Sequence, residues 1–91
     1  MSVEPFANPL GHQQITSLSS STALTVPDGT GLVMIQAETQ SIRWRDDGTA
    51  PTTTVGMLLA VGDTLFYTGK SKNLRLIETT ASAKANVAYY G

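Results

Sequence analysis

The sequence contains no cysteine, one histidine and one tryptophan. Without cysteine, disulfide bonds, thiolate metal ligands and cysteine nucleophiles are all excluded. Charge is also scarce, since Asp, Glu, Lys and Arg make up 14% of the chain, against about 25% in a typical soluble domain. Small neutral residues take their place. A surface of this kind packs against other proteins at little desolvation cost, although β-sandwiches are often rich in Ser and Thr in any case.

Other absences exclude further classes of function. The net charge is −1, so no basic excess is present to neutralise phosphates, and we expect no nucleic-acid partner. No apolar run approaches the ~18 residues of a membrane span, so we expect no membrane contact. The N-terminus lacks the basic and apolar regions of a signal peptide. With 91 residues, the chain has enough material for one core and one domain.

The most informative stretch is residues 41–67. In residues 41–45, Ile42 and Trp44 alternate with polar side chains, which is typical of a strand with one buried face. Asp46, Asp47 and Gly48 follow with the composition of a turn, because glycine adopts a positive φ freely. An apolar run at 57–60 and a second turn at 61–63 lead into another short strand.

The same alternation of short patterned runs and turns covers most of the chain. It predicts an all-β fold, a small antiparallel β-sandwich or jelly roll of seven to eight short strands. No stretch of ten or more residues has a helical period. We expect residues 32–37 to be a central strand buried on both faces, because the run is apolar throughout. The predicted strands are residues 14–18, 23–26, 32–37, 41–45, 55–60, 64–68, 74–79 and 85–90.

Residues 1–13 have no periodicity and are interrupted by Pro5 and Pro9. We therefore predict an irregular N-terminal arm at 1–13, followed by a single sandwich domain at 14–91. Phe6 and Leu10 are the large anchors of this arm, and we take both as candidates for partner contact. The alternative is a frayed terminus.

Three further residues are candidates for contact with a partner. Arg43 and Arg45 lie on the face of their strand opposite Trp44, where they either pair with the nearby aspartates or reach a neighbouring subunit. Tyr90 is the aromatic residue that we expect to be most exposed. An alternative role for Trp44, Tyr67, Tyr89 and Tyr90 is a platform that stacks on sugars, although aromatics on alternating strand positions more often fill a core.

No pattern of catalytic, cofactor-binding or metal-binding residues emerges, and we predict that the protein is not an enzyme. His12 lacks partners for a triad or metal site and is interpreted as a surface residue. Asp46 and Asp47 are adjacent, unlike the spaced acids of a calcium loop. Gly69-Lys70-Ser71 resembles the end of a phosphate loop, but Thr64 stands where that motif requires glycine.

Residues 32–91 carry a resemblance to a known group of proteins. The segments IRWRDDGTAPTTTVGMLLAVGDTLFYTG, LRLIE and NVAYYG occur in an order similar to that in small structural proteins of tailed bacteriophages and prophages. The resemblance implies a virion protein that decorates or cements the capsid, with the major capsid protein or other virion proteins as partners. Self-association as a closed homo-oligomer, such as a trimer, is a further expectation. The alternatives are a carbohydrate- or receptor-binding module and a head–tail adaptor.

Overall fold

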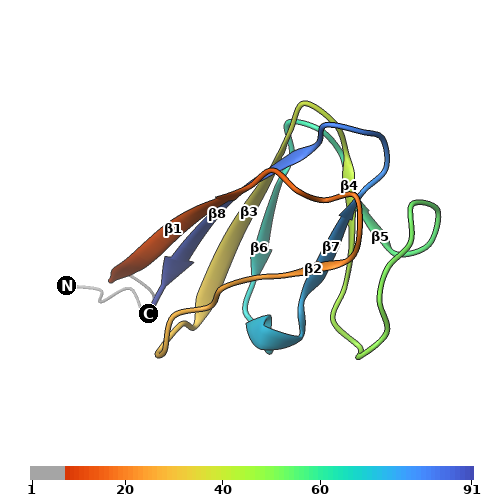
Figure 1. Cartoon of the computed structure of the whole chain (residues 1–91). Helices are drawn as coiled ribbons and strands as arrows, with labels where there is room; N and C mark the ends of the chain where they lie inside the picture. Colours follow the sequence, from red (N-terminus) through yellow and green to blue (C-terminus); the bar gives the residue numbers. More distant parts are fainter. Residues whose placement is uncertain (1–7) are drawn as a thin grey trace.

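The computed structural model describes residues 8–91, which form two four-stranded antiparallel sheets packed as a β-sandwich (Figure 1). The predicted fold class is therefore confirmed. No α-helix occurs within these residues, and one turn of 3-10 helix, η1, covers Ser71–Asn73. The strands are β1 (Pro9–Ile15), β2 (Thr22–Ala23), β3 (Leu32–Glu38), β4 (Ile42–Arg45), β5 (Met57–Leu59), β6 (Thr64–Tyr67), β7 (Arg75–Glu78) and β8 (Lys84–Tyr90).

The two sheets have matching strand orders. Sheet A runs β1-β8-β3-β6 and sheet B runs β2-β7-β4-β5. The connections β1–β2, β3–β4, β5–β6 and β7–β8 therefore each cross from one layer to the equivalent place in the other. As a result, β5 and β6 are the outermost strands at one edge of the sandwich, and β1 and β2 are the outermost strands at the other edge.

The core lies between the sheets and is formed by alternate residues of the central strands. In β8, for example, Ala85, Val87 and Tyr89 are buried, whereas the residues between them are half-buried. In β4, Ile42 is fully buried and Trp44 packs against the core, as the alternating pattern predicts. The fully buried side chains with the largest volumes are Leu18, Val33, Ile35, Ile42, Leu74, Leu76, Val87 and Tyr89.

The prediction of an irregular arm at 1–13 is wrong for residues 9–13, which belong to β1. The local sequence has no strand period, but pairing with β8 supplies the backbone hydrogen bonds that this segment needs. A register shift between Pro9 and Gly11 accommodates the irregular start of the strand. The predicted domain boundary at residue 14 thus falls inside a strand.

The prediction that residues 32–37 are buried on both faces is also wrong. In β3, Val33, Ile35 and Ala37 are buried, but Met34 is half-buried and Gln36 is exposed. Nothing among residues 8–91 covers the outer face of sheet A as a further layer, so the apolar run has one buried face only. Methionine at such a position keeps the run apolar without contributing to the core.

Candidate interaction surface

The large apolar side chains that remain mostly exposed gather in one short stretch of the described chain. They belong to Val55, Met57, Leu58, Val61 and Phe66, whose exposed fractions lie between 51% and 64%. These residues lie on β5, on β6 and in the segments that flank β5. We call this group of five side chains the 55–66 edge. Phe66 lies on the outer face of sheet A and Leu58 on the outer face of sheet B, so the group follows one border of the sandwich. Exposed apolar side chains gathered in one part of a molecule are typical of sites that bind other proteins.

Charge is almost absent from the same stretch. Between Asp47 and Lys70 the sequence carries a single charged residue, Asp63. Because few charges would be desolvated on contact, the 55–66 edge can be covered by another protein at low electrostatic cost. This combination of exposed apolar side chains and scarce charge is unusual for solvent-facing strands at the border of a sheet, which are ordinarily protected by lysine, proline or bulges.

A hollow of about 410 Å³ adjoins the 55–66 edge. It is lined by the aromatic ring of Trp44, by Val55 and Met57, and by the polar segment that follows β4. Trp44 packs edge-on against Tyr67 of the other sheet, with ring centroids 6.0 Å apart and an interplanar angle of 71°. Trp44 therefore links the lining of the hollow to sheet A through its contact with Tyr67.

A hydrogen bond between the sheets reinforces this closure. The hydroxyl of Tyr67 donates to Oδ2 of Asp46 at 2.6 Å. Burial, together with the bond to Asp46, raises the pKa of Tyr67 to about 12. Asp46 thereby ties the segment after β4, which lines the hollow, to β6 of the other sheet.

The predicted contact residues do not form one site. Phe6 lies outside the described residues. Leu10 is half-buried in β1 and packs against the core, and Tyr90 is half-buried at the end of β8, where it pairs with the start of β1. Arg43 and Arg45 lie on β4 in the other sheet. The two pairs are thus in different layers of the sandwich.

Both arginines are engaged within the chain. Arg43 donates through Nε to the carbonyl of Thr53 at 3.2 Å and through Nη1 to that of Gly56 at 3.0 Å. Arg45 forms a two-pronged pair with Asp47, at 3.0 Å and 2.5 Å. This pair lowers the pKa of Asp47 through the hydrogen bond from the guanidinium. Arg45 thus pairs with a nearby aspartate, as one of the two interpretations has it, whereas Arg43 bonds to carbonyl oxygens of the segment between β4 and β5.

The four aromatic residues considered as a sugar platform are dispersed. Tyr89 is 1% exposed and its hydroxyl donates to Oε1 of Gln13 at 2.7 Å. Trp44 and Tyr67 are half-buried against each other, and Tyr90 faces the outer side of sheet A. No flat stacking surface is assembled from them. His12 is exposed on β1, as the interpretation of a surface residue predicts.

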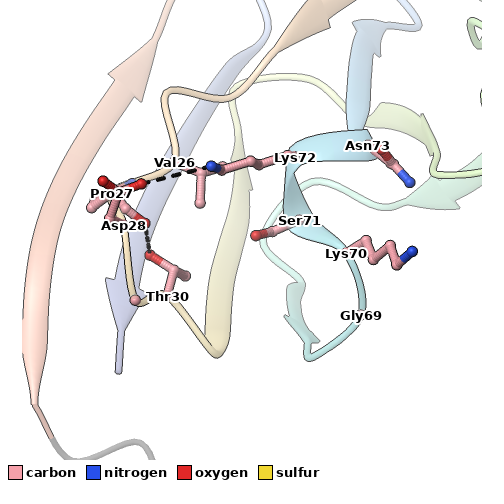
Figure 2. A pocket seen from close by; sticks show the side chains of 10 residues that line it. Val26, Pro27, Asp28, Thr30, Gly69, Lys70, Ser71, Lys72 and Asn73 are labelled. Atoms are coloured by element: carbon pink, nitrogen blue, oxygen red, sulfur yellow. Dashed lines mark hydrogen bonds and ion pairs between the residues drawn. The ribbon is translucent and has the colours of Figure 1, made fainter.

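A second hollow, of about 300 Å³, lies between the turn after residue 26 and η1 (Figure 2). Val26 and Pro27 line it together with polar side chains, among them Asp28, Thr30, Lys70 and Lys72. The Thr30 hydroxyl donates to the carbonyl of Pro27 at 2.7 Å, and Lys72 lies 3.7 Å from Asp28. Both ends of this ion pair are exposed to solvent, so the pair contributes little to stability.

The histidine and acidic side chains of residues 8–91 are scattered. In that range no three His, Asp or Glu side chains lie close enough together to hold a metal ion. No helix there has the length and apolarity that a membrane crossing requires. Known protein families, curated proteins and solved structures were compared with this chain, and none matches it.

The sequence patterns do not predict the 55–66 edge. The apolar run at 57–60 predicts a strand, but the run alone does not show which of its side chains the core accepts. The one signal in the sequence is the scarcity of charge between Asp47 and Lys70.

Proposed function

We propose that this chain is a non-enzymatic structural protein of a tailed-phage virion, which binds capsid proteins and stabilises the shell. The observation that supports this proposal most is the 55–66 edge, an apolar and nearly uncharged group of side chains on two border strands. The resemblance of residues 32–91 to phage structural proteins supplies the biological setting. The mechanism is mechanical, since a stiff sandwich lies across a joint between capsid subunits.

The size of the edge bears on how such a protein would act. Fully burying one large apolar side chain contributes about 1.5–3 kcal/mol, and each of these five is about half-exposed. Covering the whole edge therefore contributes roughly 4–8 kcal/mol, of the same order as the 4–15 kcal/mol that association costs. A single contact of this size is weak. Many copies on one shell, each holding several neighbours, give strong attachment through multivalency.

Of the two alternatives, the carbohydrate-binding module has less support than the proposed function, and the head–tail adaptor differs from it only in the number of copies per virion. A carbohydrate-binding module of the kind considered above needs an exposed aromatic platform, and Tyr89 is buried while Trp44 packs against Tyr67. A head–tail adaptor would use the same kind of protein contact in a ring at one vertex. Counting copies per virion by quantitative mass spectrometry separates the adaptor from a decoration protein.

The proposal is tested by mixing the purified chain with undecorated shells assembled from the major capsid protein of the phage or prophage that encodes it. We expect the chain to sediment with the shells and to raise their melting temperature. The double variant Met57→Lys/Leu58→Lys should bind at least about tenfold more weakly, because two charges would have to be desolvated on contact.

The matched control is Thr16→Lys/Ser19→Lys, which adds the same charge at exposed positions away from the 55–66 edge. This control should bind as the unmodified chain does. If the unmodified chain does not sediment with shells, the proposed function is wrong. If both double variants bind equally, the 55–66 edge is not the contact surface.

A further inference from the structure

The four border strands differ in how well they are protected from pairing with another chain. At one edge of the sandwich, β1 begins with Pro9 and contains a register shift, and β2 has only two residues. At the other edge, β5 has three residues. By contrast, the four residues of β6 are regular, with no proline, charge or register shift among them, and Phe66 is 64% exposed. A charge, Asp63, and a bulge in which Gly62 and Asp63 both bond to Ala37 lie only at its start. The usual devices that block edge-to-edge association are missing from β6.

The free side of β6 presents main-chain groups ready for pairing. The amide of Ala37 donates to the carbonyl of Asp63 at 3.3 Å, which fixes the alternation along the β3–β6 ladder. Because hydrogen bonding alternates along antiparallel strands, the amide and carbonyl groups of Leu65 and Tyr67 face β3. Those of Thr64 and Phe66 therefore point away from the sheet, beyond the last strand of the order β1-β8-β3-β6 (Figure 1).

We propose that β6 pairs antiparallel with β6 of a second copy of this chain, across a two-fold axis at Phe66. This inference rests on the proposed use of the 55–66 edge for protein contact. It assigns the β6 part of that edge to a second copy and leaves Leu58, on the outer face of sheet B, for capsid proteins. The pairing joins two copies of sheet A into one continuous eight-stranded sheet. It also brings the border of sheet B, with Met57, toward the same border of the second copy.

Side-chain direction restricts the position of the axis. Residues directly opposite each other in an antiparallel pair point to the same face of the sheet. In β6, Phe66 points outward with Met34 of β3, whereas Leu65 pairs with the buried Ile35 and points inward. A two-fold axis must therefore pass through a residue and not between two residues. An axis at Phe66 places each Phe66 opposite the other.

The remaining pairs in this register are complementary. Thr64 lies opposite Thr68 of the second copy, and Leu65 lies opposite Tyr67, so that the inward-facing pair is apolar. Asp63 lies opposite Gly69 and beside Lys70 of the second copy. The charges at the two ends of the seam thus approach with opposite sign, and the symmetry creates this contact twice. Cross-strand aromatic and opposite-charge pairs of this kind stabilise sheets. A seam that is complementary to itself favours a second copy over an unrelated strand.

The register is tested with single cysteines, because the chain contains none of its own. In the Phe66→Cys variant the two Cα atoms at the axis should lie about 5.5 Å apart, within the range of a disulfide. Mild oxidation should therefore give a covalent dimer. The control is Thr64→Cys, on the same strand and face. Its two Cα atoms would be roughly 14 Å apart along the seam, and it should stay monomeric.

Charged substitutions at position 66 test the two-fold axis in solution. Sedimentation velocity should show the unmodified chain in a concentration-dependent monomer–dimer equilibrium. Phe66→Lys and Phe66→Asp should each raise the dimer dissociation constant by about tenfold or more, since like charges would meet at the axis. An equimolar mixture of the two variants should dimerise again, which also proves that both are folded. His12→Lys, an exposed position on β1, should dimerise as the unmodified chain does.

Several outcomes would overturn the inference. These are a chain that stays monomeric at every concentration, an association that Phe66→Lys leaves unchanged, and a disulfide that forms at position 64 but not at 66. Binding to shells is measured separately. A monomeric chain that still binds shells through the 55–66 edge contradicts only the β6 pairing. A chain that dimerises but does not bind to shells contradicts only the proposed function.

Discussion

At the scale of single residues, two tyrosine hydroxyls link stability to pH, one on the buried Tyr89 and one on the half-buried Tyr67. Burial raises the pKa of Tyr89 to about 12, and burial together with Asp46 raises that of Tyr67 to about 12. An unfolded tyrosine has a pKa near 10. Between these two values the native state holds protons that the unfolded chain has lost, so rising pH favours unfolding.

We therefore predict that the free energy of unfolding is steady up to about pH 10 and falls as the pH rises toward about 12. The Tyr67→Phe variant should be less stable by about 1.5 kcal/mol below pH 10, because the bond to the Asp46 carboxylate is lost. Above pH 10 its stability should decline less steeply, since only Tyr89 still contributes. Urea titrations from pH 8 to pH 12 measure both effects. Parallel curves for the two proteins would contradict this account.

Gly56 occupies a position that no other residue fits. Its φ is +140°, and a Cβ atom there would lie 3.1 Å from Cβ of Pro51 and 3.2 Å from the carbonyl oxygen of Trp44. The Gly56→Ala variant should lose about 3 kcal/mol of stability, from backbone strain and from crowding. Gly29→Ala is the control, because its φ is +86° but the space around it is open. It should lose only about 1 kcal/mol, measured by the same urea titration.

An equal loss in both glycine variants would mean that crowding at Gly56 is relieved by movement of the segment between β4 and β5. That result would also weaken the description of the hollow beside Trp44, because Gly56 lines it.

At the scale of elements, Arg43 holds the long connection between β4 and β5 against the outer face of sheet B. Its guanidinium reaches two carbonyls, those of Thr53 and Gly56, from one side chain. A lysine ammonium has a single nitrogen and cannot reproduce this spread of donors. The position of Val55 at the 55–66 edge thus depends on an arginine of the neighbouring strand.

We predict that Arg43→Lys increases amide exchange at Thr52 and Val55 by about tenfold, the effect of losing one charge-assisted hydrogen bond. The amide of Thr52 donates to the carbonyl of Val55 at 2.8 Å, and the amide of Val55 donates to Oγ1 of Thr52 at 2.9 Å, so both amides report on the fold of this connection. NMR-detected exchange gives the measurement. Arg75→Lys is the control, since Arg75 bonds to carbonyls near η1. Unchanged amide exchange at Thr52 and Val55 in Arg43→Lys would show that the connection between β4 and β5 keeps its fold without the Arg43 hydrogen bonds.

Sequence patterns predicted elements well where one face is buried. The alternation around Trp44 and that around Tyr89 correctly predicted β4 and β8, because each strand has a polar or small outward face. The pattern failed at β1, where pairing with β8 decides the structure and local propensity does not. The prediction that β3 is buried on both faces also failed, because Met34 is apolar although it lies on the outer face of the sheet.

The candidate surface was harder to predict than the fold. Exposure depends on the border position of β5 and β6, and strand order cannot be deduced from the spacing of strands along the chain. Phe66 in particular has a residue type typical of a core and lies in a regular strand. Only the order of the strands in the two sheets shows that β6 lies at a border and that no further layer covers the side chain of Phe66. The predicted contacts at Arg43 and Arg45 rested on residue type, and both side chains are satisfied within the chain.

At the scale of the whole molecule, the two edges of the sandwich differ in how well they are protected from pairing with another chain. We call the protected one the guarded edge and the unprotected one the open edge. The guarded edge consists of β1 and β2, where proline, a register shift and short length limit pairing. The open edge consists of β5 and β6 and carries every mostly exposed large apolar side chain of residues 8–91. This asymmetry connects the scarcity of charge with the proposal of a protein that acts by lying against others.

Amide exchange of the full chain, measured by mass spectrometry in dilute solution and again on capsid shells, tests this account most directly. The prediction is that peptides covering residues 55–68 gain protection on the shell, because their main-chain groups become covered, while peptides covering β1 and β2 do not change. Protection gained at β1 and β2, with residues 55–68 unchanged, would contradict it.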